Sequence, residues 1–374
     1  MKILQISSAQ EFGGAERHVV DLSIELASRG HEIHLVVRPL SPLPSQVKDF
    51  GINCHTLALR GAIDLASAYK LANLIQKLKI DVVHTHYARD YPLTAIAVHL
   101  SQKLGVKPKF FLTRHHYLPV KANWAYRSLL SNVDTVIAVS TSVRDTWAKS
   151  FNLKIDSSSN SYPKLVVIPN WINREKFIIS ETQEESHQKF EISSNLPVVG
   201  IVNQLTQAKG QHLLLEAVAK LKAPCFIVFA GNEHDPEKPY TKYLEDLAKQ
   251  FNLTEKVKFL GHVKDLASLY NALDIVVIAS ENEAFSIVCL ESMICHRPVI
   301  VANVGGLAEL VKDNETGLVF PVGSSDLLAE KLSLLINDKN LAKTLTQNAY
   351  SFVEEKFLMK NVISKIEELY LNTL

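Results

Sequence analysis

The chain has 374 residues, 47% of them hydrophobic and 21% charged, which is the composition of a folded globular protein and excludes a disordered one. Its length exceeds what one hydrophobic core normally serves, so two domains are expected, and no apolar run approaches the roughly 20 residues that span a bilayer. The net charge of +1 hides an asymmetry, because residues 1–178 hold 22 Lys and Arg against 13 Asp and Glu, whereas the remainder is acidic.

The start of the chain and its cysteines indicate a compartment. MKILQISS carries a single basic residue before a β-like run, so we expect no secretory signal. No two cysteines have the CxxC spacing of a redox or metal motif, which favours reduced thiols. The four cysteines are Cys54, Cys225, Cys289 and Cys295. We therefore expect a cytoplasmic protein.

The first half of the chain alternates short apolar runs with longer amphipathic segments. Strands are predicted at residues 2–7, 31–37, 81–86, 109–113 and 135–140. A helix is predicted from Ala15 to Arg29, after a loop that contains Gly13 and Gly14. A polar loop at 156–163 precedes the last strand of this half. The alternation is typical of a parallel sheet with helices on both faces.

The same rhythm restarts in the second half. Strands are predicted at residues 197–203, 224–231, 256–261, 274–280 and 297–303. Between the halves, the polar and weakly periodic segment 173–195 is interpreted as a linker. We expect an α/β protein with two doubly wound domains that face each other across a cleft. Such sheets bind their ligands beyond the carboxyl ends of the strands.

The stretch ENEAFSIVCLE places two glutamates around a mostly apolar segment. Glu283 lies in the loop that leaves a predicted buried strand, and Ser286 is a suitable N-cap for a helix from Ile287 to about Ile294. Glu291 falls within the apolar stripe of that helix, where a buried carboxylate needs hydrogen-bond donors. Hydroxyl groups of a ligand are suitable donors, and the amides at the helix start favour a phosphate. The alternative is an ordinary loop charge followed by a solvated helix charge.

Here the chain resembles a known family. EAFSIVCLE is similar to the E-x7-E signature of retaining glycosyltransferases with the GT-B fold, especially family 4. Further similar motifs are the Gly13-Gly14 loop, VIPN (167–170), NQLTQAKG (203–210), residues 258–280, GGLAELV (305–311) and NETGLVF (314–320). The resemblance implies two Rossmann-like domains. They are an acceptor-binding domain at 1–172 and a donor-binding domain at 173–352, with a C-terminal helix at 353–374 that packs back on the first domain.

The resemblance also implies the residues that act on a nucleotide-sugar donor. Lys209 would neutralise the diphosphate, Glu283 would contact the transferred sugar, and Glu291 would bind the ribose hydroxyls. His115 matches a histidine that contacts the donor sugar, although the adjacent His116 leaves the alignment open by one residue. The other implied donor contacts are Gly13, Gly14, Gln204, Gly261, His262, Val263, Ala284, Phe285, Ser286 and Ile287.

One residue departs from the family pattern, and one cluster allows a different interpretation. Gln204 stands where the family usually has an arginine on the diphosphate, so donor affinity is weakened or another cation substitutes. His84 and His86 precede His115 and His116 as a conceivable metal cluster. We favour no metal and no cofactor, because no carboxylate has a metal-site spacing and GT-B enzymes need no metal for catalysis.

The resulting functional hypothesis is a retaining, metal-independent glycosyltransferase. It would move a sugar from a UDP- or GDP-linked donor to a glycan or lipid-linked acceptor in cell-envelope polysaccharide or glycolipid synthesis. The alternatives are a nucleotide-sugar epimerase or hydrolase of the same architecture, and a nucleotide-sugar-binding protein without activity. No basic-aromatic strand motif supports nucleic-acid binding.

A basic first half also suits an anionic membrane surface. Residues 119–130 combine Lys121 and Arg127 with Trp124 and further apolar residues, as an interfacial helix would. Packing of that helix on its own sheet is an equally good interpretation. Peripheral contact with the inner face of the cytoplasmic membrane is therefore one of two expectations.

Overall fold

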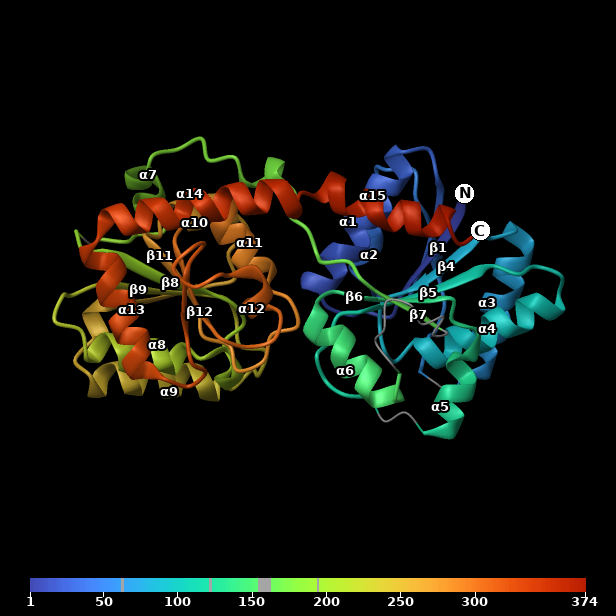
Figure 1. Ribbon diagram of the computed structural model, residues 1–374, viewed down its shortest axis with the longest axis horizontal. Coiled ribbons are helices and arrows are strands. Elements are labelled where there is room, and N and C mark those ends of the chain that lie inside the picture. The colour runs from blue at the N-terminus through green and yellow to red at the C-terminus, as the bar shows by residue number, and fades with distance from the viewer. Residues whose placement is uncertain (62–63, 121–122, 154–162, 194) are drawn as a thin grey trace. The chain divides into compact units, whose positions relative to one another are not determined.

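The computed structural model describes residues 1–61, 64–120, 123–153, 163–193 and 195–374. The chain divides into two compact units, which Figure 1 draws from blue to red along the chain. The first unit comprises Met1–Asn170 together with Lys360–Leu374, and the second comprises Trp171–Met359. Each unit is built on its own parallel sheet with helices on both faces, as the sequence predicts.

The first unit contains, within the described residues, a seven-stranded parallel sheet in the order β3-β2-β1-β4-β5-β6-β7. Its strands are β1 (Lys2–Ser7), β2 (Glu32–Val37), β3 (Asn53–Thr56), β4 (Val82–Thr85), β5 (Lys109–Arg114), β6 (Thr135–Ala138) and β7 (Lys164–Val167). Its helices are α1 (Gly14–Ser28), α2 (Leu43–Val47), α3 (Leu65–Leu78), α4 (Tyr91–Lys103), α5 (Trp124–Leu129), α6 (Thr141–Phe151) and α15 (Met359–Leu371), with the turn η1 (Leu130–Asn132). The reversal of strand order beside β1 is the topology of a doubly wound fold.

In the first sheet, the strand that the sequence does not reveal is β3. Its four residues, NCHT, contain no apolar run, and three of the four side chains are exposed because β3 is an edge strand beside β2. The predicted strands and the predicted helix after Gly13-Gly14 are confirmed with shifted ends. Most of the predicted loop at 156–163 lies outside the described residues.

The second unit contains, in the part of the chain that is described, a six-stranded parallel sheet in the order β10-β9-β8-β11-β12-β13. Its strands are β8 (Val198–Val202), β9 (Phe226–Ala230), β10 (Val257–Gly261), β11 (Ile275–Ile278), β12 (Val299–Ala302) and β13 (Leu318–Phe320). Its helices are α7 (Gln183–Lys189), α8 (Gln211–Ala219), α9 (Pro239–Gln250), α10 (Leu266–Asn271), α11 (Ile287–Ile294), α12 (Leu307–Leu310), α13 (Ser325–Asn337) and α14 (Lys339–Lys356). The turns η2 (Arg174–Phe177), η3 (Gln207–Lys209) and η4 (Thr254–Lys256) complete it.

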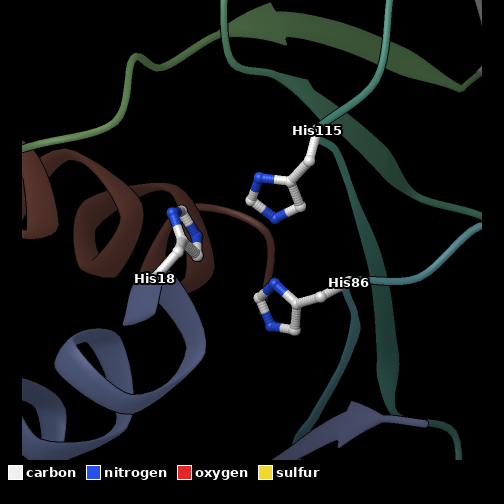
Figure 2. A group of neighbouring side chains, drawn as sticks. All are labelled: His18, His86 and His115. Carbon is white, nitrogen blue, oxygen red and sulfur yellow. The ribbon is translucent and has the colours of Figure 1, made fainter. Parts of the chain in front are cut away.

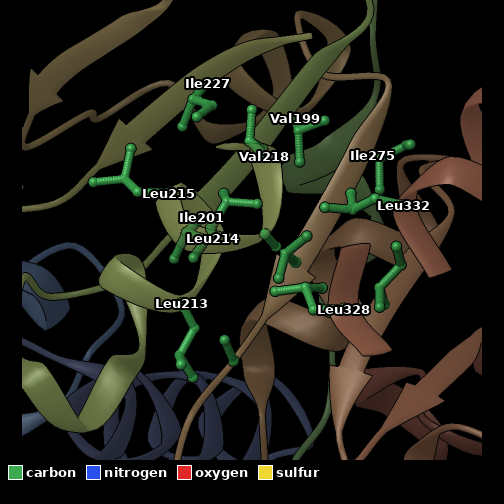
Figure 3. Close-up of a cluster of buried hydrophobic side chains, with 14 of the residues drawn as sticks. Val199, Ile201, Leu213, Leu214, Leu215, Val218, Ile227, Ile275, Leu328 and Leu332 are labelled. Carbon is green, nitrogen blue, oxygen red and sulfur yellow. The ribbon is translucent and has the colours of Figure 1, made fainter. Parts of the chain in front are cut away.

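The core of the second unit is the apolar layer between this sheet and helices α8, α9 and α13. Figure 3 shows Leu214 and Val218 of α8 beside Val199 and Ile201 of β8. Strands β8 and β11 are buried on both faces, which explains their uninterrupted apolar runs. Burial of each such side chain stabilises the fold by about 1.5–3 kcal/mol before the loss of chain entropy. The layer gives the loops at the sheet edge a rigid base.

Two predicted segments differ from the structure. Residues 173–195 are not a free linker, because they form η2 and α7, and Gln183 Nε2 donates to Asp274 Oδ1 at 3.2 Å. The predicted C-terminal helix at 353–374 is instead the end of α14 and the separate helix α15. Helix α15 is anchored in the first unit by Arg29, whose guanidinium lies 2.7 Å from the Glu367 carboxylate.

No helix among the described residues has the length and apolar character needed to cross a membrane.

A close backbone contact fixes the turn between β8 and α8. Gly210 has φ +73°, and a Cβ placed on it would lie 2.4 Å from the carbonyl oxygen of Ala279 at the end of β11. The neighbouring amide of Glu281 donates to the carbonyl of Ala208 at 2.9 Å. The turn that follows β8 is therefore held directly against the exit of β11.

We predict that Gly210→Ala destabilises the second unit much more than Gly323→Ala. Both glycines have nearly the same φ, +73° and +77°, but a Cβ on Gly323 meets nothing within 4 Å. The control change should cost about 1 kcal/mol of unfolding free energy from backbone strain alone. The clash at Gly210 should add about 2 kcal/mol. Urea unfolding measures both, and equal costs would contradict the close contact.

Candidate functional site

The loops at the carboxyl edge of the second sheet bring two predicted site residues together. Lys209 ends η3, after β8, and Glu283 lies in the loop after β11. Lys209 Nζ donates to Glu283 Oε2 at 2.9 Å, and both side chains are largely buried, with 23% and 14% exposed. An ion pair shielded from water to this degree is stronger than a surface pair. The two residues are separated by 74 positions in sequence and meet only through the fold.

The loop of Glu283 is held by Gly306, the residue that precedes helix α12. The amide of Gly306 donates to the carbonyl of Glu283 at 2.9 Å. A Cβ on Gly306 would lie 2.2 Å from the carbonyl oxygen of Ala284, so the two backbones touch at a distance that only glycine allows. The predicted GGLAELV motif thus supports the Glu283–Ala284 loop.

Helix α11 begins as predicted. Ser286 is its N-cap, and the Ser286 hydroxyl accepts a hydrogen bond from the amide of Cys289 at 3.3 Å. Phe285 and Ser286 are buried, whereas Ile287 is partly exposed at the start of the helix. The N-terminal amides of α11 therefore lie at the same sheet edge as Glu283, where their partial positive charge favours an anion.

The sequence predicts a buried Glu291, and its side chain is 3% exposed. The hydrogen-bond donor, however, is one that sequence reasoning missed. Tyr270 of α10 donates its hydroxyl proton to Glu291 Oε2 at 2.8 Å, and Tyr270 is itself fully buried. The sequence signal was present, because ASLYNALD puts a tyrosine into an apolar segment where its hydroxyl needs a partner. The Tyr270 hydroxyl thus supplies at least one of the hydrogen bonds that the buried Glu291 carboxylate requires.

The remaining predicted donor residues of this unit lie at the same edge. The amide of Gly231, after β9, donates to the carbonyl of Gly261 at 2.7 Å. His262 is exposed and Val263 is partly exposed, and both line a surface hollow with Phe190. Gln204 is exposed, and its carbonyl accepts a hydrogen bond from Gln211 Nε2 at 2.9 Å. The order of the loops after β8, β10 and β11 suits an extended ligand.

In the first unit, His115 belongs to a cluster of three imidazoles (Figure 2). His115 follows β5, His86 follows β4, and His18 comes from α1. One ring nitrogen of each lies within 4.8 Å of the other two. His116 is exposed, and the side chain of His84 is bonded elsewhere, to Tyr370 Oη and Thr113 Oγ1. The histidines that lie together are therefore not the four that the sequence analysis considered and disfavoured as a metal cluster, but a trio that includes His18, which sequence reasoning missed.

Burial keeps the three imidazoles neutral. Desolvation lowers the pKa of His18 from 6.5 to about 3, against the raising effect of its bond to Asn170. Desolvation, together with the charge of neighbouring histidines, holds the pKa of His86 and that of His115 well below their usual range. Each therefore carries one nitrogen with a free electron pair at neutral pH.

The glycine loop of the first unit is closed by an acidic side chain. The amide of Gly13 donates to Glu16 Oε2 at 2.8 Å, and Gly14 is the first residue of α1. Tyr87 donates to the other oxygen of Glu16. Both glycines are exposed, so their backbone is accessible to a ligand.

The predicted interfacial segment is only partly described. Lys121 lies outside the described residues, and Trp124 at the start of α5 is 83% exposed. Arg127 donates to the carbonyl of Phe151 at 2.7 Å, which ties α5 to α6. The structure thus shows both an exposed tryptophan and packing within the unit, and membrane contact stays a prediction.

Comparisons with known proteins match both units. The family described as Glycosyltransferase Family 4 matches residues 12–176, and the family described as Glycosyl transferases group 1 matches residues 182–352. N-acetyl-alpha-D-glucosaminyl L-malate synthase of Bacillus anthracis is 25% identical over 97% of this chain and 94% of its own length. D-inositol 3-phosphate glycosyltransferase of Corynebacterium urealyticum is 24% identical over 98% and 92%. Among solved structures, Anabaena HepE in complex with UDP has a TM-score of 0.86 at 22% identity, with both chains fully covered.

We predict that Tyr270→Phe destabilises the second unit by about 1–3 kcal/mol, because a buried carboxylate loses a hydrogen-bond donor. A double-mutant cycle with Glu291→Gln should give a coupling of about 1 kcal/mol or more. The matched control is Tyr350→Phe, which removes a Tyr–Glu bond of the same 2.8 Å length to the more exposed Glu354. It should cost about 0.5 kcal/mol or less. Zero coupling between Tyr270 and Glu291 would contradict the assignment.

Proposed function

Because this chain is a glycosyltransferase of the group 1 and family 4 type, built from two Rossmann-like domains, we propose that it is a retaining, metal-independent enzyme with a nucleotide-diphosphate-sugar donor. The sugar passes to a glycan or lipid-linked acceptor, in cell-envelope polysaccharide or glycolipid synthesis. The reaction takes place in the cytoplasm, with peripheral contact between the basic first unit and the inner face of the membrane.

The observation that carries the donor site is the Lys209–Glu283 ion pair beside the start of α11. An anionic diphosphate that approaches this edge meets a lysine ammonium and the N-terminal amides of a helix. When Lys209 turns from Glu283 to the phosphates, the Glu283 carboxylate becomes free to accept hydrogen bonds from sugar hydroxyls. The pair thus provides a cation for the diphosphate of the donor and a carboxylate for its sugar.

The other predicted donor contacts extend this arrangement. Glu291 is proposed to bind the ribose hydroxyls with an orientation set by Tyr270. The backbone of Gly261, His262 and Val263 is proposed to lie against the base. His115 is proposed to contact the transferred sugar from the first unit, as a neutral imidazole whose low pKa results from burial.

The proposed chemistry is electrostatic. The bond between the anomeric carbon and the diphosphate oxygen breaks, and the bond from the acceptor oxygen forms on the same face of the sugar. Lys209 and the helix amides stabilise the charge that develops on the leaving diphosphate. A departing phosphate oxygen takes the acceptor proton, so no covalent nucleophile is required.

Names of similar proteins support the choice of ligands to test. Solved structures of Anabaena HepE contain UDP, UDP with glucose, and UDP-glucose. One relative is named for an L-malate acceptor and another for an inositol phosphate acceptor, and both of these are anions. The excess of basic residues in 1–178 suits an anionic acceptor of this kind. Because the HepE structures contain UDP or UDP-glucose, we propose UDP-sugars as the first donors to test, ahead of GDP-sugars.

A binding screen and a donor-only incubation separate this proposal from its alternatives. A UDP-sugar that binds the folded chain raises the melting temperature, and absence of any shift with UDP-, GDP- and ADP-sugars would contradict the donor site. Epimerised donor, or rapid nucleotide release without acceptor, would identify an epimerase or hydrolase. Donor binding without turnover across an acceptor panel would favour the inactive binding protein that Gln204 suggests.

We predict that Lys209→Met lowers kcat by about a hundredfold to a thousandfold, because the leaving diphosphate loses its cation. Lys249→Met, on the exposed side of α9, removes the same charge and should leave transfer unchanged. Steady-state transfer assays measure both variants. An unchanged kcat in Lys209→Met would contradict the role of this lysine in catalysis.

We predict that Gln204→Arg tightens UDP binding by about tenfold, because a guanidinium adds a charge-assisted hydrogen bond to the diphosphate. Gln204 is exposed and its backbone is held by Asn203 and Gln211, so a longer side chain fits. Gln207→Arg, also exposed, is the control for added charge alone. Calorimetric titration with UDP compares the three proteins. Equal gains in both variants would show that Gln204 does not face the diphosphate.

A further inference from the structure

The His18, His86 and His115 cluster has the chemistry of a transition-metal site. One ring nitrogen from each histidine lies within 4.8 Å of the corresponding nitrogens of the other two. Figure 2 shows the three rings turned toward a common centre. In a tetrahedral site with Zn–N bonds of about 2.0–2.1 Å, the nitrogens stand roughly 3.4 Å apart. A closure of about 1.4 Å, within the reach of side-chain rotation, converts the observed geometry into the bound one.

The hydrogen-bond acceptors beside two of the rings fix the tautomer whose unprotonated nitrogen can bind a metal. His18 Nδ1 lies 2.9 Å from Asn170 Oδ1, and because this oxygen only accepts, Nδ1 carries the proton and Nε2 carries the electron pair. His86 Nε2 lies 2.7 Å from Gln5 Oε1, which in the same way leaves the electron pair on Nδ1. Metal-binding histidines usually donate their other ring N–H to an oxygen acceptor in this manner, which fixes the tautomer and the ring orientation.

Two of the ring nitrogens that face the centre of the cluster make no hydrogen bond within the described residues. His86 Nδ1 and His115 Nε2 are buried, and neither has a hydrogen-bond partner among the described residues. His86 is 2% exposed, so bulk water does not readily supply the missing hydrogen bond to Nδ1. A buried nitrogen without a partner is costly, and such an atom points to a ligand.

We propose that His18, His86 and His115 form a binding site for a divalent transition-metal ion such as Zn²⁺, with a fourth position open to water. Imidazole nitrogen suits Zn²⁺, Co²⁺, Ni²⁺ and Cu²⁺, whereas Mg²⁺ and Ca²⁺ prefer oxygen ligands. None of these three histidines is among the diphosphate contacts proposed above, which belong to the second unit. The site uses His115, however, which is the proposed contact for the transferred sugar.

This shared residue gives the site a consequence that rests on the proposed function. A His115 nitrogen that binds a metal ion is withdrawn from the sugar, so metal occupancy and transfer exclude each other. The ion thus acts as an inhibitor whose removal restores activity. The metal-binding claim itself does not depend on the reaction and is tested without substrate.

The test is a titration of the metal-free full chain with Co²⁺, followed by its visible absorption. We expect one ion per chain, with the intense bands of a four-coordinate ion, which Zn²⁺ then displaces. His18→Gln and His86→Gln should each abolish these bands, and Asn170→Ala should weaken Co²⁺ affinity by about 10-fold to 100-fold. His116→Gln is the control, since His116 is exposed and adjacent to the cluster.

Wild-type protein without four-coordinate bands at millimolar Co²⁺ would overturn the site. So would unchanged bands in the His18 and His86 variants. Circular dichroism checks that each variant is folded, and if either histidine variant fails to fold, the Asn170→Ala affinity decides. For the consequence, Zn²⁺ should slow wild-type transfer and a chelator should restore it. A site that fills with Zn²⁺ without slowing transfer would overturn the inhibition alone.

Discussion

Close contact between loop backbones at the carboxyl edge of the second sheet determines where the charged side chains of the site lie. Gly210 brings the turn after β8 against Ala279, and Gly306 brings the turn after β12 against Ala284. No side chain fits in either contact, so the loops of Lys209 and Glu283 have little freedom to separate. The ion pair between them follows from this packing, since the two residues are far apart in sequence. The apolar layer under the sheet holds these strands in place.

The Lys209–Glu283 pair explains how such a site stays stable without a ligand. An unpaired lysine in a largely buried position would be costly, and so would an unpaired carboxylate. Each charge neutralises the other, and in the proposed function a ligand with an anionic part and a hydroxyl-bearing part replaces both interactions. Glu291 is treated differently, because Tyr270 holds its carboxylate in position within the fold. One glutamate is therefore exchangeable and the other is fixed, which suits a ligand whose sugar reacts and whose nucleoside does not.

The sequence was sufficient for the sheets because their buried strands are apolar runs, and for α11 because Ser286 and the following apolar residues have the pattern of a capped, buried helix. It was also sufficient for the burial of Glu291. It did not reveal β3, whose edge position leaves it polar, or β13, whose three residues LVF are too short to stand out as an apolar run. It also did not reveal the role of 173–195, whose helix is held by contacts with distant residues such as Asp274. Tyr270 and His18 were missed for the same physical reason. Their partners come from other elements of the fold, and local periodicity carries no information about such contacts.

The most direct test of the central claim is an experimental structure of the chain with a bound UDP-sugar or an unreactive analogue. The account predicts that Lys209 Nζ leaves Glu283 and lies within hydrogen-bond distance of a phosphate oxygen. Glu283 then accepts hydrogen bonds from the sugar, Glu291 contacts the ribose, and the Tyr270–Glu291 bond persists. A nucleotide bound away from this sheet edge, or an intact Lys209–Glu283 pair in the complex, would contradict it.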